Sequence, residues 1–420
     1  MRWLLLTGLW LCYFAFGALA ASIAPLVVPI QAELGLSHAA LGSIMGAWQF
    51  VYIGAAIPAG MLLDRLGGRR ALTLGVLCIA LSAFGRAAAQ DYWQLLAAVM
   101  VFGIGGPIVS SGAPKVVTEI FQGSQRGLAM GIYMTGPTLG GILALTLTHP
   151  VLLPALDGDW RNVMTLWGIV AVVAAVAWYA IVTRFGFGIS GFSPDASPIA
   201  ASAEATQPRA AGSSGFLLAI RGLLTIPGVP LVLAMSVGVF LINHGMNNWL
   251  PEMLRHGGMS QTEAGFWAAL PMLVGIAGSL TIPALATQER RFRILGVLCL
   301  AAAVSSLLLT LEGTVATTTA LLVQGLVRST LMTVLILTLM ELPGMRPGQA
   351  GTASGLFFSA AEIGGVLGPL GLGVLYDLTH GFNPGLYVLA GVAVAMLFGT
   401  ARLTRIGRAA GGGVASVSDR

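Results

Sequence analysis

Residues 60–70 read Gly-Met-Leu-Leu-Asp-Arg-Leu-Gly-Gly-Arg-Arg. This short charged stretch separates two apolar runs, near residues 38–63 and 71–89. The glycines at positions 60 and 67 permit a tight turn and a close approach of two helices, because glycine has no Cβ atom. Each flanking run is long enough for the roughly 20 apolar residues that a membrane-spanning helix needs. The stretch therefore predicts a charged turn between two membrane helices.

The composition of the whole chain also predicts a membrane protein. Of its 420 residues 56% are hydrophobic and only 9% are charged, against roughly a quarter charged in an average soluble domain. A soluble fold of this length would not have enough charged residues to cover its surface. The net charge of +5 comes from basic residues spread singly through apolar sequence, which favours topology signals over a nucleic-acid site.

Twelve apolar runs follow one another along the chain, and we predict an all-α membrane protein with 12 transmembrane helices. The first run contains Ala18-Leu19-Ala20, which imitates the cleavage site of a secretory signal. Because that run continues through Ile30, we interpret it as the first membrane helix. The runs lie near residues 4–30, 38–63, 71–89, 93–120, 127–150, 161–184, 229–253, 262–287, 293–311, 315–341, 349–376 and 384–404.

The second six runs repeat the first six. Gly35-Leu36-Ser37 recurs as Gly258-Met259-Ser260, Ile57-Pro58-Ala59 as Ile282-Pro283-Ala284, and Gly140-Gly141 as Gly364-Gly365, at offsets of 223, 225 and 224 residues. A constant offset indicates a parallel duplication into two pseudo-symmetric six-helix bundles. We expect an N-terminal bundle (1–185), a cytoplasmic linker rich in Gly, Ser, Pro and Ala (186–215), a C-terminal bundle (216–407) and a cytoplasmic tail (408–420). Residues 216–224 are expected to form a short helix on the membrane surface.

The arginines predict the orientation in the membrane. With the N-terminus inside, the outer connections hold only Arg86, Arg161 and Arg255. Lys and Arg concentrate in cytoplasmic loops, so we expect a bacterial inner-membrane protein with both termini in the cytoplasm. The arginines in or beside the inner connections are Arg65, Arg69, Arg70, Arg126, Arg184, Arg290, Arg291, Arg293, Arg346, Arg402, Arg405 and Arg408.

Residues 60–70 resemble the GxLxDRxGxRR signature of the major facilitator superfamily, and they stand where that family has it, between helices 2 and 3. The resemblance implies transport by alternating access and a cytoplasmic latch that holds the outward-open state. It also implies that Glu119 and Glu341, at the ends of helices 4 and 10, pair with loop arginines. Alternatively, the arginines only anchor the topology. The predicted latch residues are Gly60, Asp64, Arg65, Gly67, Arg69, Arg70, Glu119, Arg126 and Glu341.

Two weaker resemblances concern the subfamily. Residues 248–251 (Asn-Trp-Leu-Pro) and 275–283 are loosely similar to cyanate-type transporters, which handle a small anion. Residues 136–141 resemble the GPxxGG element of proton-coupled antiporters, although Gly131 stands one position too far upstream. Packing of small residues between helices would also explain these glycines.

Ionisable residues inside membrane spans are rare and commonly functional. Arg328 lies halfway along the tenth run with no acidic residue three or four positions away. A guanidinium group there is suited to bind a carboxylate or another small anion. Glu362 lies midway along the eleventh run, where loss of water penalises the charged carboxylate and favours a group that binds and releases protons. Alternatively, Glu362 forms a structural ion pair with Arg328.

The seventh run contains four polar residues within six positions, Asn243, His244, Asn247 and Asn248. We expect Asn243, His244 and Asn247 to bind substrate, and His244 is a second candidate for proton coupling. Hydrogen bonds between helices would explain one or two of them. Gln49 and Tyr133 are further candidates for substrate contact. The only lysine, Lys115, is expected to pair with Glu119 one turn later; alternatively, it adds positive charge to the inner cavity.

No nucleotide-binding, metal-binding or nucleophile–base pattern appears in the sequence. We therefore expect no enzymatic activity, no cofactor and no metal, and a monomer driven by an ion or substrate gradient. Three functions are compatible with the residues. The first is a proton-coupled transporter of small anions. The second is a proton-driven multidrug exporter. The third is a membrane sensor, although residues 408–420 offer little room for a signalling tail.

Overall fold

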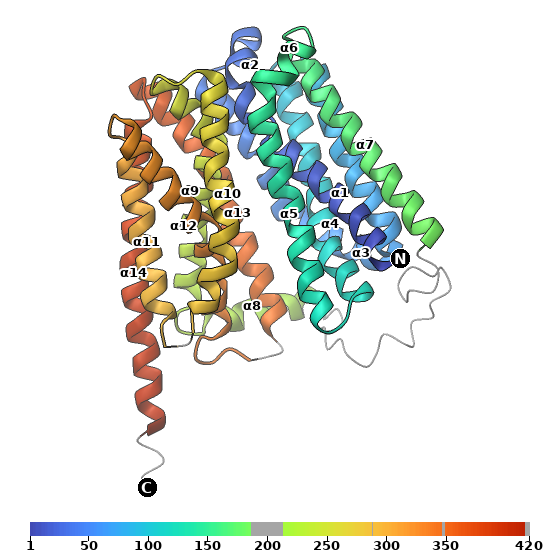
Figure 1. Cartoon of the computed structure of the whole chain (residues 1–420). Helices are drawn as coiled ribbons and strands as arrows, with labels where there is room; N and C mark the ends of the chain where they lie inside the picture. Colours follow the sequence, from blue (N-terminus) through green and yellow to red (C-terminus); the bar gives the residue numbers. More distant parts are fainter. Residues whose placement is uncertain (186–212, 288, 347–348, 416–420) are drawn as a thin grey trace. The chain divides into compact units, whose positions relative to one another are not determined.

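A computed structural model describes residues 1–185, 213–287, 289–346 and 349–415, and every regular element in these ranges is a helix (Figure 1). The predicted linker, up to residue 212, and residues 416–420 of the predicted tail lie outside the described residues. The elements are α1 (Arg2–Ala21), the 3-10 helix η1 (Ala24–Leu26), α2 (Val27–Leu34), α3 (His38–Ala88), α4 (Tyr92–Ile120), α5 (Ser124–Leu147), the π-helix η2 (Thr148–Leu152), α6 (Leu153–Ala155), α7 (Trp160–Phe185), α8 (Ser213–Leu224), α9 (Val229–His256), α10 (Gln261–Leu285), α11 (Arg291–Leu308), α12 (Thr314–Met340), α13 (Ala350–Thr379) and α14 (Asn383–Ala415).

Eleven helical segments in the described ranges are long and apolar enough to cross a membrane. One of them, α3, has 51 residues, which is about twice the length of a single crossing. The backbone leaves the helical conformation inside α3 at Gly67, where φ is 71° and ψ is 163°. Only glycine adopts this conformation without strain. Gly67 therefore separates the predicted second and third spans, and the chain is a multi-pass membrane protein with the predicted all-helical fold.

The chain divides into two compact units. The first contains Met1–Ser202 together with two segments from the second half, Asn247–Ala269 and Pro369–Leu378. The second contains Ala203–Met246, Leu270–Gly368 and Thr379–Arg420. The boundary between the units crosses α9, α10 and α13 within their lengths. It therefore does not coincide with the division between the two sets of six predicted spans.

Glycines allow the first and fifth helices of each half to touch through their backbones. In the first unit a methyl group at Gly140 of α5 would collide with the Phe14 carbonyl oxygen of α1. In the second unit a methyl group at Gly364 of α13 would collide with the Val237 carbonyl oxygen of α9. Gly140 and Gly364 are the glycines that the sequence repeat aligns. The same helix crossing thus occurs in both halves, and it accounts for these glycines by small-residue packing.

The first span is interrupted between α1 and η1, and a buried arginine contacts the end of α1. The Arg86 guanidinium donates hydrogen bonds to the Leu19 carbonyl oxygen at 2.9 Å and to the Ser22 hydroxyl at 3.3 Å. It also lies 5.3 Å from the centre of the Phe102 ring. We predicted Arg86 in an outer connection, but its side chain is only 1% exposed. Its hydrogen bonds satisfy acceptors at the end of a helix, where carbonyl groups lack helical partners.

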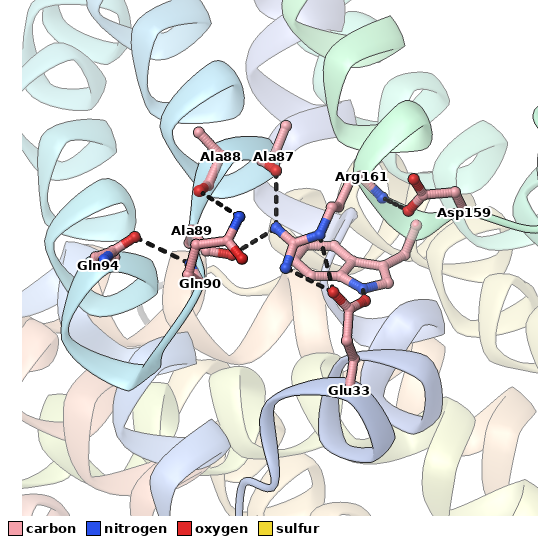
Figure 2. Close-up of polar contacts among 9 residues, drawn as sticks. Glu33, Ala87, Ala88, Ala89, Gln90, Gln94, Asp159 and Arg161 are labelled. Atoms are coloured by element: carbon pink, nitrogen blue, oxygen red, sulfur yellow. Dashed lines mark hydrogen bonds and ion pairs between the residues drawn. The ribbon is translucent and has the colours of Figure 1, made fainter.

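A second arginine, Arg161, joins α7 to α2 and to the end of α3 (Figure 2). Its guanidinium donates hydrogen bonds to the Glu33 carboxylate of α2, at 2.7 and 3.0 Å, and to the Ala87 and Ala89 carbonyl oxygens at the end of α3. The Trp160 indole donates to the other oxygen of Glu33. These contacts fix one end of the first unit, because a planar guanidinium can satisfy several acceptors at once.

Candidate functional site

The polar turn of α9 lies beside the middle of α12. The Asn243 side-chain amide donates a hydrogen bond to the Arg328 carbonyl oxygen at 3.2 Å. The guanidinium of Arg328 also lies close enough to His244 for an electrostatic interaction. Although Arg328 is far from Asn243 and His244 in the sequence, the three residues meet in the second unit. Asn247 lies one turn further along α9, and its buried Oδ1 atom has no hydrogen-bond partner among the described residues.

Arg328 is half-buried at the centre of α12. Across the described ranges, its guanidinium makes no hydrogen bond or ion pair. A guanidinium group presents five N–H donors and is always charged. Placing such a group in a membrane span without a carboxylate is costly. The arrangement leaves the charge available to a ligand.

Glu362 of α13 is 5% exposed, and its Oε2 atom has no hydrogen-bond partner among the described residues. No ion pair joins Glu362 to Arg328, although both residues belong to the second unit. The alternative interpretation, in which Glu362 is the structural partner of Arg328, is therefore wrong for this conformation. A buried carboxyl group without a cation is chemically able to hold a proton.

Gln324 of α12 is a residue that the sequence analysis missed. Its side chain is 3% exposed, and its Oε1 atom has no donor among the described residues. It precedes Arg328 by four positions, so the two side chains share one face of the helix. The signal was present in the sequence as a polar residue one turn before Arg328 in the apolar run 315–341.

The two candidates from the first half lie in the first unit, among aromatic side chains. Tyr133 is 4% exposed and meets Tyr13 edge-on, with ring centres 5.1 Å apart. Gln49 is fully buried on α3. The Tyr13 hydroxyl donates to the Ser110 carbonyl oxygen at 3.0 Å, and the Tyr52 hydroxyl lies 2.8 Å from the Ser110 hydroxyl. That Gln49 and Tyr133 contact substrate stays a prediction.

The charged turn at residues 60–70 contacts α4 through its aspartate. The Lys115 ammonium lies 2.6 Å from Asp64, so the predicted pairing of Lys115 with Glu119 is replaced by one with Asp64. This exchange depends on the packing of α3 against α4, which helical spacing does not reveal. A methyl group at Gly60 would meet no atom within 4 Å. In this conformation Gly60 therefore makes no close helix contact, whereas Gly67 has the predicted turn conformation.

The other predicted latch residues have varied contacts. Glu341 forms an ion pair with Arg291 at the start of α11, within the second unit. Arg126 donates to the Phe121 carbonyl oxygen at 3.3 Å, and the Arg69 guanidinium lies 5.6 Å from the Tyr179 ring centre. Glu119 lies near Lys115 and Asp64, and no ion pair with a loop arginine is seen for it in the described ranges. The role of these residues and of Arg65 and Arg70 as a latch stays a prediction.

A carboxylate from α13 caps the N-terminus of α3, and no sequence signal predicted it. Asp377 accepts hydrogen bonds from the backbone N–H groups of His38 at 3.0 Å and Ala39 at 2.8 Å. The His38 ring stacks on Tyr376, with ring centres 3.7 Å apart, and on Trp249. A methyl group at Gly373 would collide with the His38 carbonyl oxygen. Helices from the two halves of the sequence thus make direct contact within the first unit.

A model of the Major Facilitator Superfamily matches residues 9–369. The chain belongs to this superfamily. It is therefore a membrane transporter and not an enzyme, as its sequence predicted. The match spans both halves and includes Asp64, Asn243, Arg328 and Glu362.

Individual transporters are more distant. The "Quinolone resistance transporter" of Acinetobacter baumannii is 25% identical over 88% of this chain and 85% of that protein. The "Cyanate transport protein CynX" of Escherichia coli is 26% identical over 66% of this chain and 65% of that protein. A crystal structure of the nucleoside transporter NupG matches with a TM-score of 0.74 at 12% identity, over 96% of this chain and 98% of that one. The structural match shows the fold, and the similarity to a cyanate transporter agrees with the predicted resemblance.

Proposed function

We propose that this transporter moves a small anion, a carboxylate or a cyanate-like ion, by alternating access and in symport with protons. We further propose that it lies in a bacterial inner membrane with both termini in the cytoplasm. The arginines of the connections support this orientation. Asn243 and His244 contribute to the anion site beside Arg328, and Asn247, Gln49 and Tyr133 are further candidates.

The proposal rests on the Arg328 guanidinium. It lies at the centre of α12 without a carboxylate partner among the described residues. An anionic substrate would supply the missing charge through bidentate, charge-assisted hydrogen bonds, each about twice as strong as a neutral one. His244 and Asn243 bring further polar groups to the same level of the second unit. A neutral or cationic substrate would leave this charge uncompensated.

Proton coupling is assigned to Glu362. Glu362 is buried and its Oε2 atom has no partner among the described residues. Such a carboxyl group is stable when it is protonated and neutral, and it needs a cation or water when it is ionised. His244 is the second candidate because imidazole titrates near physiological pH. Because Glu362 and Arg328 form no ion pair with each other, the proton and the anion can bind at different groups.

Binding of anions to the purified protein tests the proposal. We expect carboxylates or cyanate to raise the thermal unfolding temperature of the wild type, and Arg328→Ala to weaken this binding about 10- to 100-fold, the value of one charged hydrogen bond. Arg328→Lys keeps the charge but loses the bidentate geometry, so an intermediate affinity is expected. Arg221→Ala, an exposed arginine on α8, is the matched control.

The alternative function is a proton-driven multidrug exporter. The glycine–proline element at 136–141 and the similarity to a quinolone resistance transporter favour it. The tight contact of Gly140 with α1 accounts for one glycine of that element without reference to export. Stabilisation of the protein by lipophilic cations alone, unchanged in Arg328→Ala, would favour the exporter and reject the anion transporter.

A further inference from the structure

We infer that Gln324 forms part of the anion site and that the substrate carries a hydroxyl group near its anionic group. This inference rests on the proposed function and narrows it, because a hydroxylated carboxylate has such a group and cyanate does not. Gln324 would accept a hydrogen bond from the substrate hydroxyl, while Arg328 binds the anionic group. Gln324 is then a specificity-determining residue.

The unsatisfied amide oxygen of Gln324 is the first observation. The side chain is 3% exposed, and Oε1 has no hydrogen-bond donor among the described residues. Buried polar atoms in folded proteins nearly always have a partner, and an orphaned acceptor requires an explanation. Other buried polar side chains on α12 are satisfied: the Thr338 hydroxyl, for example, donates to the Val334 carbonyl oxygen at 2.8 Å.

The position of Gln324 relative to Arg328 is the second observation. Residues four apart on a helix are neighbours on its surface, with Cβ atoms about 5–6 Å apart. Among the described residues, the Gln324 Oε1 atom has no donor and the Arg328 guanidinium makes no hydrogen bond or ion pair, and the two residues stand one turn apart on α12. The two groups are therefore close enough for one small molecule to bind both.

The packing of α12 shows which faces are already occupied. Ser329 donates a hydrogen bond to the Gly275 carbonyl oxygen of α10 at 2.7 Å, and a methyl group at Gly325 would come within 2.8 Å of the Pro271 carbonyl oxygen. The face of α12 that carries Gly325 and Ser329 therefore packs against α10. Beside Arg328, the polar side chain that approaches the backbone is Asn243 of α9. The row formed by Gln324 and Arg328 is thus separate from the α10 contact and lies on the helix that meets the polar turn of α9.

The chemistry of the two side chains specifies the ligand class. Arginine only donates hydrogen bonds, whereas the amide oxygen of glutamine only accepts them. A ligand that satisfies both needs an anionic group and a donor a few bonds away. A 2- or 3-hydroxy carboxylate or a polyhydroxy acid meets both requirements. Cyanate and simple alkanoates satisfy the arginine but leave the glutamine acceptor unpaired.

Matched pairs of anions test the inference on the purified full-length protein. Dissociation constants are measured for L-lactate against propionate and for glycolate against acetate, with cyanate as a further probe. We expect the wild type to bind the hydroxylated member about tenfold more tightly, equivalent to about 1.4 kcal/mol. Gln324→Met, similar in length but without an acceptor, should reduce the ratio to about one while it retains the affinity for propionate. Thr338→Val, a buried polar residue on the same helix, is the matched control and should keep the wild-type ratio.

The outcomes separate this inference from the proposed function. Absence of binding by every anion, or binding that Arg328→Ala leaves unchanged, rejects both. Binding that depends on Arg328 but shows no preference for the hydroxylated member in the wild type overturns the inference alone. A preference that persists in Gln324→Met overturns the role of Gln324. The wild-type comparison does not depend on a variant, and the unfolding temperature without ligand checks that each variant is folded.

Discussion

Arg328, Gln324 and Glu362 are polar groups of the second unit that membrane helices carry at a cost and that find no partner among the described residues. Such groups are usually satisfied within the protein. Arg86 shows the contrast, because it is more deeply buried than Arg328 but donates to Leu19 and Ser22. An arginine that donates to backbone and side-chain acceptors in this way stabilises the fold, whereas one that makes no hydrogen bond or ion pair is a candidate for ligand binding.

Glu362→Gln tests proton coupling at the level of one residue. The amide is similar in size but cannot exchange a proton, so we predict that it abolishes the accumulation of substrate driven by an inward proton gradient. Exchange of labelled for unlabelled substrate, which needs no net proton movement, should continue. Both are measured in vesicles with a set pH difference.

Glu312→Gln is the control for this experiment, because Glu312 is an exposed carboxylate in the loop before α12. It should leave the response to the gradient unchanged. If Glu362→Gln still accumulates substrate like the wild type, the assignment of the proton to Glu362 is wrong. His244→Gln then becomes the next variant to measure.

At the scale of elements, α3 and α13 are joined by a close contact that includes a helix cap. Asp377 supplies a negative charge to the N-terminus of α3, where backbone N–H groups lack partners and the helix dipole is positive. Gly42 and Gly373 let the two backbones touch. This contact joins segments from both halves of the sequence. Under the alternating access proposed above, we predict that this contact separates when its side of the protein opens.

Asp377→Ala tests this contact. Removal of a helix cap costs about 1 kcal/mol, so we predict that the contact between α3 and α13 opens more often. The measurement is the rate at which a membrane-impermeant thiol reagent labels Ala39→Cys in a protein whose native cysteines are replaced. A loss of about 1 kcal/mol in the stability of this contact corresponds to a several-fold increase in the labelling rate, which we expect for Asp377→Ala.

Asp91→Ala is the matched control because Asp91 caps α4 through the N–H of Gln94 at 2.9 Å, within one half of the sequence. It should lower the unfolding temperature without a change in the labelling of Ala39→Cys. Equal labelling in the two variants would show that the α3–α13 contact does not control access.

At the scale of the whole molecule, the arginines predict how the chain lies in the membrane. Arg65, Arg69, Arg70 and Arg126 belong to connections on one side, and Arg161 and Arg255 to the other. Loops rich in Lys and Arg remain in the cytoplasm, and this preference determines the orientation of the helices. The orientation is therefore open to a direct test with cysteines at exposed positions.

We predict that an impermeant maleimide added to intact cells labels Gln90→Cys and Gln261→Cys but not Gln122→Cys. All three glutamines are exposed and lie at or beside helix ends. Lysed cells, in which every position is accessible, provide the control. Labelling of Gln122→Cys alone in intact cells would reverse the proposed orientation.

Several properties of this protein follow from its sequence by itself. The transfer of apolar side chains to lipid depends on each segment's own composition, so the spans were predictable without tertiary contacts. The turn at Gly67 was predictable because its cause is local. The repeat that aligns Gly140 with Gly364 predicted a duplicated bundle, and the same helix crossing occurs in both halves. Arg328 and Glu362 were recognisable because charge is rare in such segments.

Only the tertiary structure determined the partners of the polar residues. Lys115 contacts Asp64 rather than Glu119, and Asp377 caps a helix whose first residue is 339 positions away in sequence. Arg86 donates to the Leu19 carbonyl oxygen of α1, whereas the Gln324 Oε1 atom is left without a donor among the described residues. Helical spacing identifies neighbours on the same helix, but contacts between helices depend on how they pack. The charged turn at residues 60–70 shows both: its sequence predicted the turn, and the packing of α3 against α4 selected Lys115 as the partner of its aspartate.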